Sequence, residues 1–297
     1  MEAYLSVLTF ALISVVSVCG IYVLTGLTGM FSLGQAAFMA IGAYISGMLV
    51  VRLNMPFALA AIIAVAGSML IGFIVGLPTV RLRRDYISLV TLGFGEAITA
   101  LLNQSVQVTG GAMGFSGIPQ KTNFTLVVVS VIVSVALVGF LKVSKYGRQC
   151  IALKSDELAA KAMGINVPRM KMIAFLISVG MTAYSGVLYA FYTTYVDPSM
   201  FGWRKSAEWV IMVFFGGVNS LTGSIVATLI LSALPEMLRF ASEYRMFFYS
   251  VLVLLIINFK PSGLFGEFEL SPSHISKLFK RGHKNGAVNV AASGKDQ

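Results

Sequence analysis

The sequence predicts an all-α protein, a polytopic bundle of about eight to ten transmembrane helices, because apolar runs long enough to cross a bilayer recur along most of it. Of the 297 residues, 57% are hydrophobic and only 11% are charged, whereas soluble domains carry roughly 25% charged residues. The mean hydropathy is +0.84. The apolar runs are continuous rather than alternating, which argues against a membrane β-barrel.

Apolar spans follow one another along the chain, separated by short polar loops. They cover residues 5–25, 32–51, 57–78, 86–104, 124–142, 171–195, 206–219, 222–241 and 244–260. The first span is expected to remain as a helix, because no basic segment precedes it and no small-residue cleavage site follows it. The seventh span is short, so a half-helix or a re-entrant segment is expected there.

The second and third spans carry small residues on one helix face. In the third span these are Ala60, Ala64, Ser68, Gly72 and Gly76, and in the second they are Ala36, Ala40, Ala43 and Gly47. Small residues let helix backbones approach closely in lipid. Both faces are therefore predicted to be helix contacts, either for simple packing or for an interface that slides.

The fourth span contains a carboxylate next to two glycines, in Thr91-Leu-Gly-Phe-Gly-Glu96. A charge at mid-bilayer is costly and normally faces a polar cavity or a partner. Two roles stay open for Glu96: lining a pathway, or bonding to backbone groups that the glycines leave free.

A glycine-rich loop follows the fourth span. It runs from Gln107 to Pro119 and includes Thr109, Gly110, Gly111 and Gly114. Glycine clusters indicate irregular backbone, and no Lys-Ser/Thr pair follows them, which excludes a phosphate-binding loop. The loop is interpreted as an external mouth or docking loop, with a plain connector as the alternative.

The loop over residues 143–171 predicts a short, capped helix outside the membrane. Asp156 and Glu157 suit the positive end of a helix dipole, and Ser155 is a candidate N-cap. Gly164 is a candidate C-cap, and Pro168 should stop any continuation.

The distribution of the 22 Lys and Arg residues predicts the topology. If the spans alternate in direction, most of these residues fall on the side that holds residues 79–85, residues 142–171 and the end of the chain. Positive loops stay cytoplasmic, so the N-terminus is predicted outside and the C-terminus inside. The net charge of +10 is then explained by basic residues on the cytoplasmic side of a membrane, and no nucleic acid partner is expected.

Two regions follow from this pattern, a transmembrane domain over residues 1–270 and a basic cytoplasmic tail over residues 271–297 that is predicted to be disordered. Cys19 and Cys150 have no His or Cys at ligand spacing, and His274 and His283 both lie in the tail. No metal site, cofactor site or catalytic residue is therefore expected.

The loop motif Glu157-x-Ala-Ala-x-Ala-x-Gly-Ile165 resembles the EAA loop of ATP-binding-cassette importer permeases. Other motifs are similar, in the same order, to those of the branched-chain amino acid permease family. They lie at residues 26–38, 41–44, 83–96, 109–119, 216–223, 244–245 and 259–265. The chain departs from the family at Gln35, where His is expected, and from the general EAA form at Leu158.

The resemblance implies that the loop forms a coupling helix that docks on an ATPase. The residues carried over to this role are Asp156, Glu157, Ala159, Ala160, Ala162, Gly164 and Ile165. A translocation path lined by weakly polar side chains is also implied, with candidates Ser32, Gln35, Thr91 and Glu96.

The resemblance further implies a bacterial inner-membrane subunit surrounded by lipid. Its partners would be a second homologous permease, two ATPases that bind the ATP, and an extracytoplasmic substrate-binding protein. The implied substrates are branched-chain or related small amino acids, with urea or short amides as an alternative. An ATP-independent secondary transporter is the rival class, although its coupled mid-membrane charges are not evident beyond Glu96. A channel would show a filter or pore ring, and none is apparent.

Overall fold

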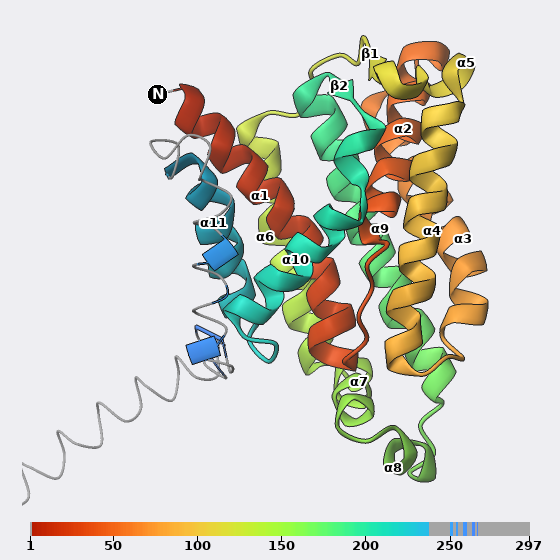
Figure 1. The fold of residues 1–297 in the computed structure, drawn as a ribbon, viewed down its shortest axis with the longest axis vertical. Helices are drawn as coiled ribbons and strands as arrows, with labels where there is room; N and C mark the ends of the chain where they lie inside the picture. The colour runs from red at the N-terminus through yellow and green to blue at the C-terminus, as the bar shows by residue number, and fades with distance from the viewer. Residues whose placement is uncertain are drawn as a thin grey trace, which may run out of the picture.

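The computed structural model of the chain describes residues 2–237 and, beyond them, residues 250, 251, 254, 258, 259, 263, 264 and 266. Helices standing side by side make up the body of the molecule (Figure 1). The predicted tail over residues 271–297 lies outside the described residues, as does most of the predicted span 244–260, including the motif residues 244–245.

Six of the described helices are long and apolar enough to cross a membrane. They are α1 (Glu2–Tyr22, continued by the π-helix η1, Val23–Leu27), α2 (Gln35–Leu53), α3 (Phe57–Thr79), α4 (Arg84–Gln104), α6 (Phe124–Val143) and α9 (Val167–Thr193). They confirm the polytopic α-helical fold, with bounds within a few residues of the first six predicted spans.

The seventh predicted span is a half-helix. α10 (Trp203–Gly216) has 14 residues, which rise about 21 Å and so fall short of a bilayer core of about 30 Å. A short turn connects it to α11 (Leu221–Met237), which packs against α1 and α10.

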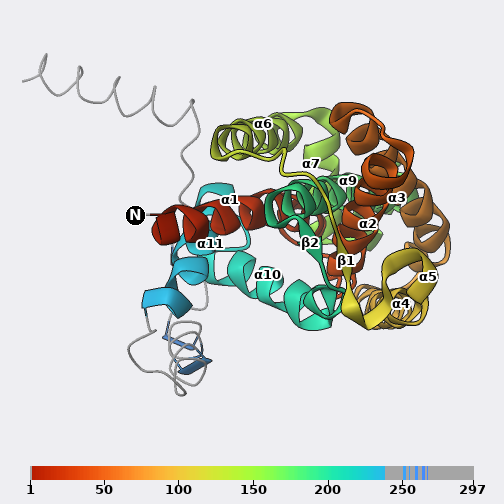
Figure 2. The same cartoon turned by 90° about the horizontal axis from the view of Figure 1, so that it is seen from above.

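α9 occupies the centre of the bundle, in contact with α1, α2 and α3 (Figure 2). Glycines allow α2 and α9 to pack closely. A Cβ on Gly42 of α2 would overlap the carbonyl oxygen of Ala183, and a Cβ on Gly186 of α9 would overlap the carbonyl oxygen of Met39. The small-residue face of α3 also packs on α9, with Gly72 against Val179. The contact of Gly72 confirms the predicted small-residue face of α3 as a packing surface, whereas Gly42 of α2 was not among the residues predicted.

One end of the bundle is closed by short elements of the glycine-rich loop. These are α5 (Val106–Thr109), the 3₁₀ turn η2 (Gly111–Met113) and β1 (Phe115–Ser116). β1 pairs antiparallel with β2 (Tyr195–Val196), which follows α9 and leads into the 3₁₀ turn η3 (Pro198–Phe201). This small sheet was not predicted from the sequence.

At the opposite end, two helices project beyond the bundle (Figure 1). They are α7 (Lys145–Ser155) and α8 (Glu157–Ala162). The sequence predicted only one helix in this loop, so α7 was not expected.

Loops that the charge pattern places on one side of the membrane meet at this end. The Lys154 ammonium of α7 donates to the Gly26 carbonyl oxygen at 2.9 Å and to Asn219 Oδ1 at 2.7 Å, and the Arg84 guanidinium donates to the Leu153 carbonyl oxygen. We call this the inner end and the opposite one the outer end, following the predicted topology.

Candidate functional site

α8 is capped at its start by Asp156. The Asp156 carboxylate accepts the backbone N–H groups of Leu158 and Ala159, at 2.8 and 3.1 Å. The prediction that Ser155 is the N-cap is wrong, because α7 continues through Ser155, whose hydroxyl donates back to the Ile151 carbonyl oxygen. The backbone becomes extended only at Asp156, where a cap residue must lie.

α8 ends in a Schellman motif around Gly164. The Gly164 N–H donates to the Lys161 carbonyl oxygen at 3.0 Å, and the Ile165 N–H to that of Ala160 at 3.1 Å. Gly164 has a φ of +81°, a backbone conformation that L residues rarely adopt and glycine adopts readily. The prediction for Gly164 is confirmed. Pro168, by contrast, lies in the first turn of α9.

An ion pair fixes α8 to the central helix. Lys171 Nζ lies 2.8 Å from Glu157 Oε1, and the Lys171 side chain is only 2% exposed while that of Glu157 is 40% exposed. Glu157, predicted to contact the ATPase, therefore has a partner inside this chain. Its carboxylate orients α8 relative to α9.

α8 exposes large apolar side chains to solvent, beside the charged Asp156 and Lys161. Leu158 is 79% exposed and Met163 is 84% exposed; Ala159, Ala162 and Gly164 are also exposed, whereas Ala160 is buried. Neither Leu158 nor Met163 was among the predicted coupling residues. Large apolar residues in a loop expected to lie in water were the available signal.

α7 ties the same segment to two other connections. Asn219, in the turn between α10 and α11, accepts Lys154 through Oδ1 at 2.7 Å and Lys142 through its carbonyl oxygen at 2.9 Å. Burial, together with the neighbouring charges of Lys142 and Arg84, lowers the pKa of Lys154. Lys142, Lys154 and Arg84 thus hold the inner end together by donating to oxygens of neighbouring segments.

Three of the four predicted path residues meet where α2 begins. Residues 29–34 are not helical, and α2 starts at Gln35 rather than near residue 32. Gln35 Nε2 donates to Ser32 Oγ at 3.4 Å, and Gln35 Oε1 accepts the Thr182 hydroxyl at 3.2 Å. The Leu33 N–H donates to Thr91 Oγ1 at 3.1 Å.

The side chains of this junction satisfy the first N–H groups of α2. Ser206 of α10 accepts the Ala36 N–H at 2.8 Å, and Thr91 of α4 accepts the N–H just before the helix. These bonds, with the one from the Ala37 N–H to the Gly34 carbonyl oxygen, supply acceptors for backbone donors at a helix start that lies inside the bundle. In this conformation Ser32, Gln35 and Thr91 are buried, and they join α2, α4, α9 and α10.

Glu96 lies apart from that junction, on the exposed side of α4. Its Oε1 accepts the Trp203 N–H at the start of α10 at 3.4 Å. A cavity of about 540 Å³ opens beside it. The charged residues that line the cavity, which we call the charged cluster, are Glu96, Arg204, Lys205 and Glu208.

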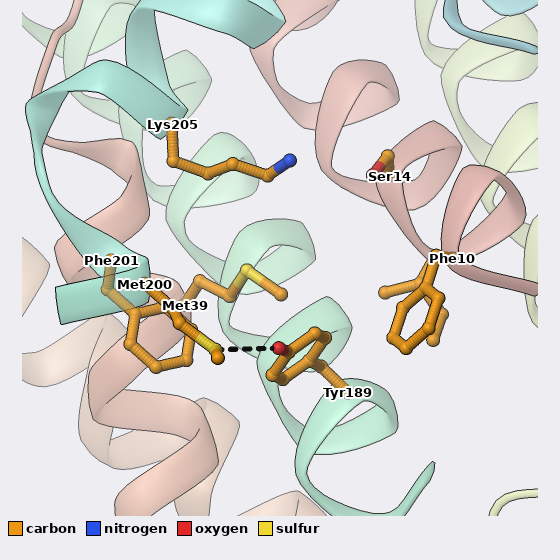
Figure 3. Close-up of a pocket in the computed structure, with 8 residues that line it drawn as sticks. Phe10, Ser14, Met39, Tyr189, Met200, Phe201 and Lys205 are labelled. Carbon is orange, nitrogen blue, oxygen red and sulfur yellow. Dashed lines mark hydrogen bonds between the residues drawn. The ribbon is translucent and has the colours of Figure 1, made fainter. Parts of the chain in front are cut away.

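A second cavity, of about 360 Å³, is lined mostly by apolar side chains and includes Lys205 (Figure 3). Its apolar and aromatic lining comes from Phe10, Ile13, Met39, Tyr189, Met200 and Phe201. The Lys205 ammonium extends into this cavity on the side of Ser14, and the Tyr189 hydroxyl donates to Met200 Sδ at 3.0 Å. Met200 and Lys205 line both cavities.

The glycine-rich loop forms an ordered cover over the outer end. Thr109 is buried and its hydroxyl lies 2.7 Å from the Leu102 carbonyl oxygen. Gly110, Gly111 and Gly114 have φ values of +80°, +62° and +72°, and a Cβ on Gly114 would clash with Tyr195. The glycines are thus required by the backbone and by the close approach to β2.

No group of three or more His, Cys, Asp or Glu that could hold a metal ion lies within the described part of the chain. Cys150 is buried in α7, and burial raises the pKa of its thiol to about 11.

The chain is similar to known transport proteins. A family model described as the permease component of branched-chain amino acid transport systems matches residues 3–257. The high-affinity branched-chain amino acid transport system permease protein LivM of Salmonella typhimurium is 31% identical, covering 86% of this chain and 68% of the relative. LivH of Escherichia coli K12 is 26% identical over 88% of this chain and 92% of the relative. No solved structure matches.

Proposed function

The chain belongs to the family of permease components of branched-chain amino acid transport systems, and from this premise we propose that it is the membrane subunit of an ATP-driven importer in the bacterial inner membrane. Its partners would be a second homologous permease, two ATPases and an extracytoplasmic substrate-binding protein. The chain itself would bind no ATP and catalyse no reaction. Its C-terminus would lie in the cytoplasm.

The construction of α7 and α8 is the observation that supports this proposal best. α8 is capped at both ends, anchored to α9 through Glu157 and Lys171, and carries the exposed apolar side chains Leu158 and Met163. A rigid helix with protruding apolar residues is suited to insertion into a groove on a partner. A solvated connector would need neither the helix caps nor the exposed side chains of Leu158 and Met163.

The contacts of this segment give a route for coupling. Movement of an ATPase against α8 would reach α9 through the Glu157–Lys171 ion pair. It would also reach the α1–α2 and α10–α11 connections through Lys154, which bonds to Gly26 and Asn219. Both connections adjoin half-helical or irregular backbone, which moves more readily than a continuous helix.

The docking surface is tested by co-purification of the ATPases with the tagged chain in the whole complex. Leu158→Glu and Met163→Glu place a charge on the proposed contact and are expected to lower ATPase capture at least tenfold. Met113→Glu makes the same kind of change at the outer end, where Met113 is 88% exposed, and is the matched control. Full capture by both α8 variants would contradict the proposal.

Branched-chain or related small amino acids are the proposed substrates, as the names of the relatives suggest. Uptake of labelled leucine into proteoliposomes that hold the complex, ATP and the binding protein should require ATP hydrolysis. Uptake of urea or a short amide in its place would make the chain a permease for that class. Uptake by this chain alone, without ATPases, would establish a secondary transporter instead.

A further inference from the structure

Glu96 and the start of α10 lie deep in the layer that the membrane would occupy. α4 runs from Arg84 to Gln104, so Glu96 is about 18 Å from its inner end and about 12 Å from its outer end. The hydrogen bond from the Trp203 N–H to Glu96 puts the start of α10 at the same depth. Arg204 and Lys205 follow directly.

Charged side chains at this depth are expensive unless they meet a partner or an aqueous cavity. Lys205 and Glu208 pair with each other at 2.9 Å. Within the described residues, Arg204 makes no ion pair or hydrogen bond, and Glu96 accepts only a backbone N–H. Within the part of the chain that the structure describes, a guanidinium without an anionic partner and a carboxylate without a cationic partner thus line one open cavity.

We infer that the charged cluster binds the head group of a zwitterionic α-amino acid in transit, an inference that rests on the proposed function. Arg204 receives the substrate carboxylate, because a guanidinium binds a carboxylate through two parallel hydrogen bonds. Glu96 accepts the substrate ammonium through its carboxylate. The site is neutral as a whole, since Lys205 and Glu208 compensate each other, and it therefore fits a ligand that carries one charge of each sign.

The apolar cavity in Figure 3 completes the site for an aliphatic side chain. It adjoins the charged cavity at Met200 and Lys205. A dry cavity of roughly 150 Å³ holds a benzene molecule, so about 360 Å³ has room for the side chain of leucine. Urea and short amides offer neither the opposite charges nor the apolar group.

Binding of labelled L-leucine to the purified complex of both permeases and both ATPases in lipid nanodiscs, without the binding protein, tests the inference. Arg204→Gln and Glu96→Gln are each expected to lower binding at least tenfold, and Arg204→Lys should retain part of it. Lys121→Gln removes an exposed cation at the outer end and should bind as wild type. ATPase capture should be unchanged in all variants.

Two further arms separate the substrate chemistry from a loss of structure. Leucinamide lacks the carboxylate and 4-methylpentanoate lacks the ammonium, so both should compete at least tenfold less well than unlabelled leucine. Ser14→Phe fills the apolar cavity and should weaken leucine binding more than alanine binding.

Equal competition by urea, or wild-type leucine binding by both neutral variants, would overturn the inference. The importer would still stand if wild type takes up an amino acid with ATP and the binding protein. Loss of ATPase capture in the Arg204 and Glu96 variants would overturn the inference too, since these residues would then hold the fold. A wild-type complex that neither binds nor imports any amino acid would overturn the proposed function and the inference together.

Discussion

The side chains of Glu157 and Lys171 differ in burial, and this difference predicts which substitution will cost more stability. Lys171 is enclosed, whereas Glu157 reaches solvent. Glu157→Gln leaves an ammonium without its counter-charge in an enclosed site, which costs about 3 kcal/mol, the lower end for a broken buried pair because one partner is partly exposed. Lys171→Met leaves a carboxylate that water can solvate, so the cost should be smaller.

Thermal unfolding of the purified chain and hydrogen exchange over residues 145–171 measure this difference. Glu157→Gln should speed exchange in α8 and lower the unfolding temperature more than Lys171→Met does. The double variant should recover most of the loss. Equal effects of the two single variants would show that the ion pair does not anchor α8.

Lys154 predicts a specific dependence of stability on pH. Its pKa in the folded chain lies below the ordinary value of 10.5, through burial and the charges of Lys142 and Arg84. At pH values between the folded and unfolded pKa, the unfolded state binds more protons, so raising the pH through this interval stabilises the fold. The stability of wild type relative to Lys154→Met should therefore rise as the pH approaches 10.5.

The unfolding temperatures of wild type and Lys154→Met are measured as the pH is raised toward 10.5, and the difference between them is followed. Titrating groups that do not interact with Lys154 are common to the two proteins, so their effects cancel in the difference. A difference that stays flat or falls with rising pH would contradict the assignment.

At the scale of elements, the crossing of α2 and α9 depends on one glycine in each helix. Gly42 meets the backbone of Ala183, and Gly186 meets that of Met39. A methyl group at either position cannot be accommodated by a side-chain rotation, because the obstacle is a carbonyl of the facing helix. Gly42→Ala and Gly186→Ala should each destabilise the bundle by about 1–3 kcal/mol or more.

Gly139 in α6 is the matched control, because a Cβ there would meet nothing within 4 Å. Gly139→Ala should be neutral or slightly stabilising, since alanine favours helix. Unfolding temperatures in detergent distinguish these outcomes. A Gly186→Ala variant as stable as Gly139→Ala would mean that the helices do not cross as closely as the structure has them.

Elements that follow one local rule could be predicted from the sequence, whereas those that depend on distant contacts could not. The long apolar spans and the Gly164 cap follow from composition and local backbone preference. The start of α2 at Gln35 does not, because Ser206 of α10 accepts the Ala36 N–H and Thr91 of α4 accepts the Leu33 N–H just before the helix. The partnership of Glu157 with Lys171 was equally hidden, since the two residues lie on separate helices.

At the scale of the whole molecule, the flanks of the bundle differ in polarity. The outward faces of α3 and α6 are apolar, with Ile62, Leu70, Ile132 and Phe140 exposed. The side formed by α4 and α10, which lies opposite α6 in Figure 2, carries the charged cluster. Lipid suits the first surface and not the second, so the second permease should lie against the α4–α10 side, with water between.

Spin labels at matched depth test this arrangement in the assembled complex. Thr99 on α4 and Val129 on α6 lie the same number of residues from the outer ends of their helices. In a background with Cys19→Ser and Cys150→Ser, a label at residue 129 should be relaxed by oxygen dissolved in the bilayer and little by a water-soluble nickel complex. A label at residue 99 should show the reverse. Strong oxygen relaxation at both positions would mean that the α4–α10 side faces lipid, and the second permease would then have to pack elsewhere.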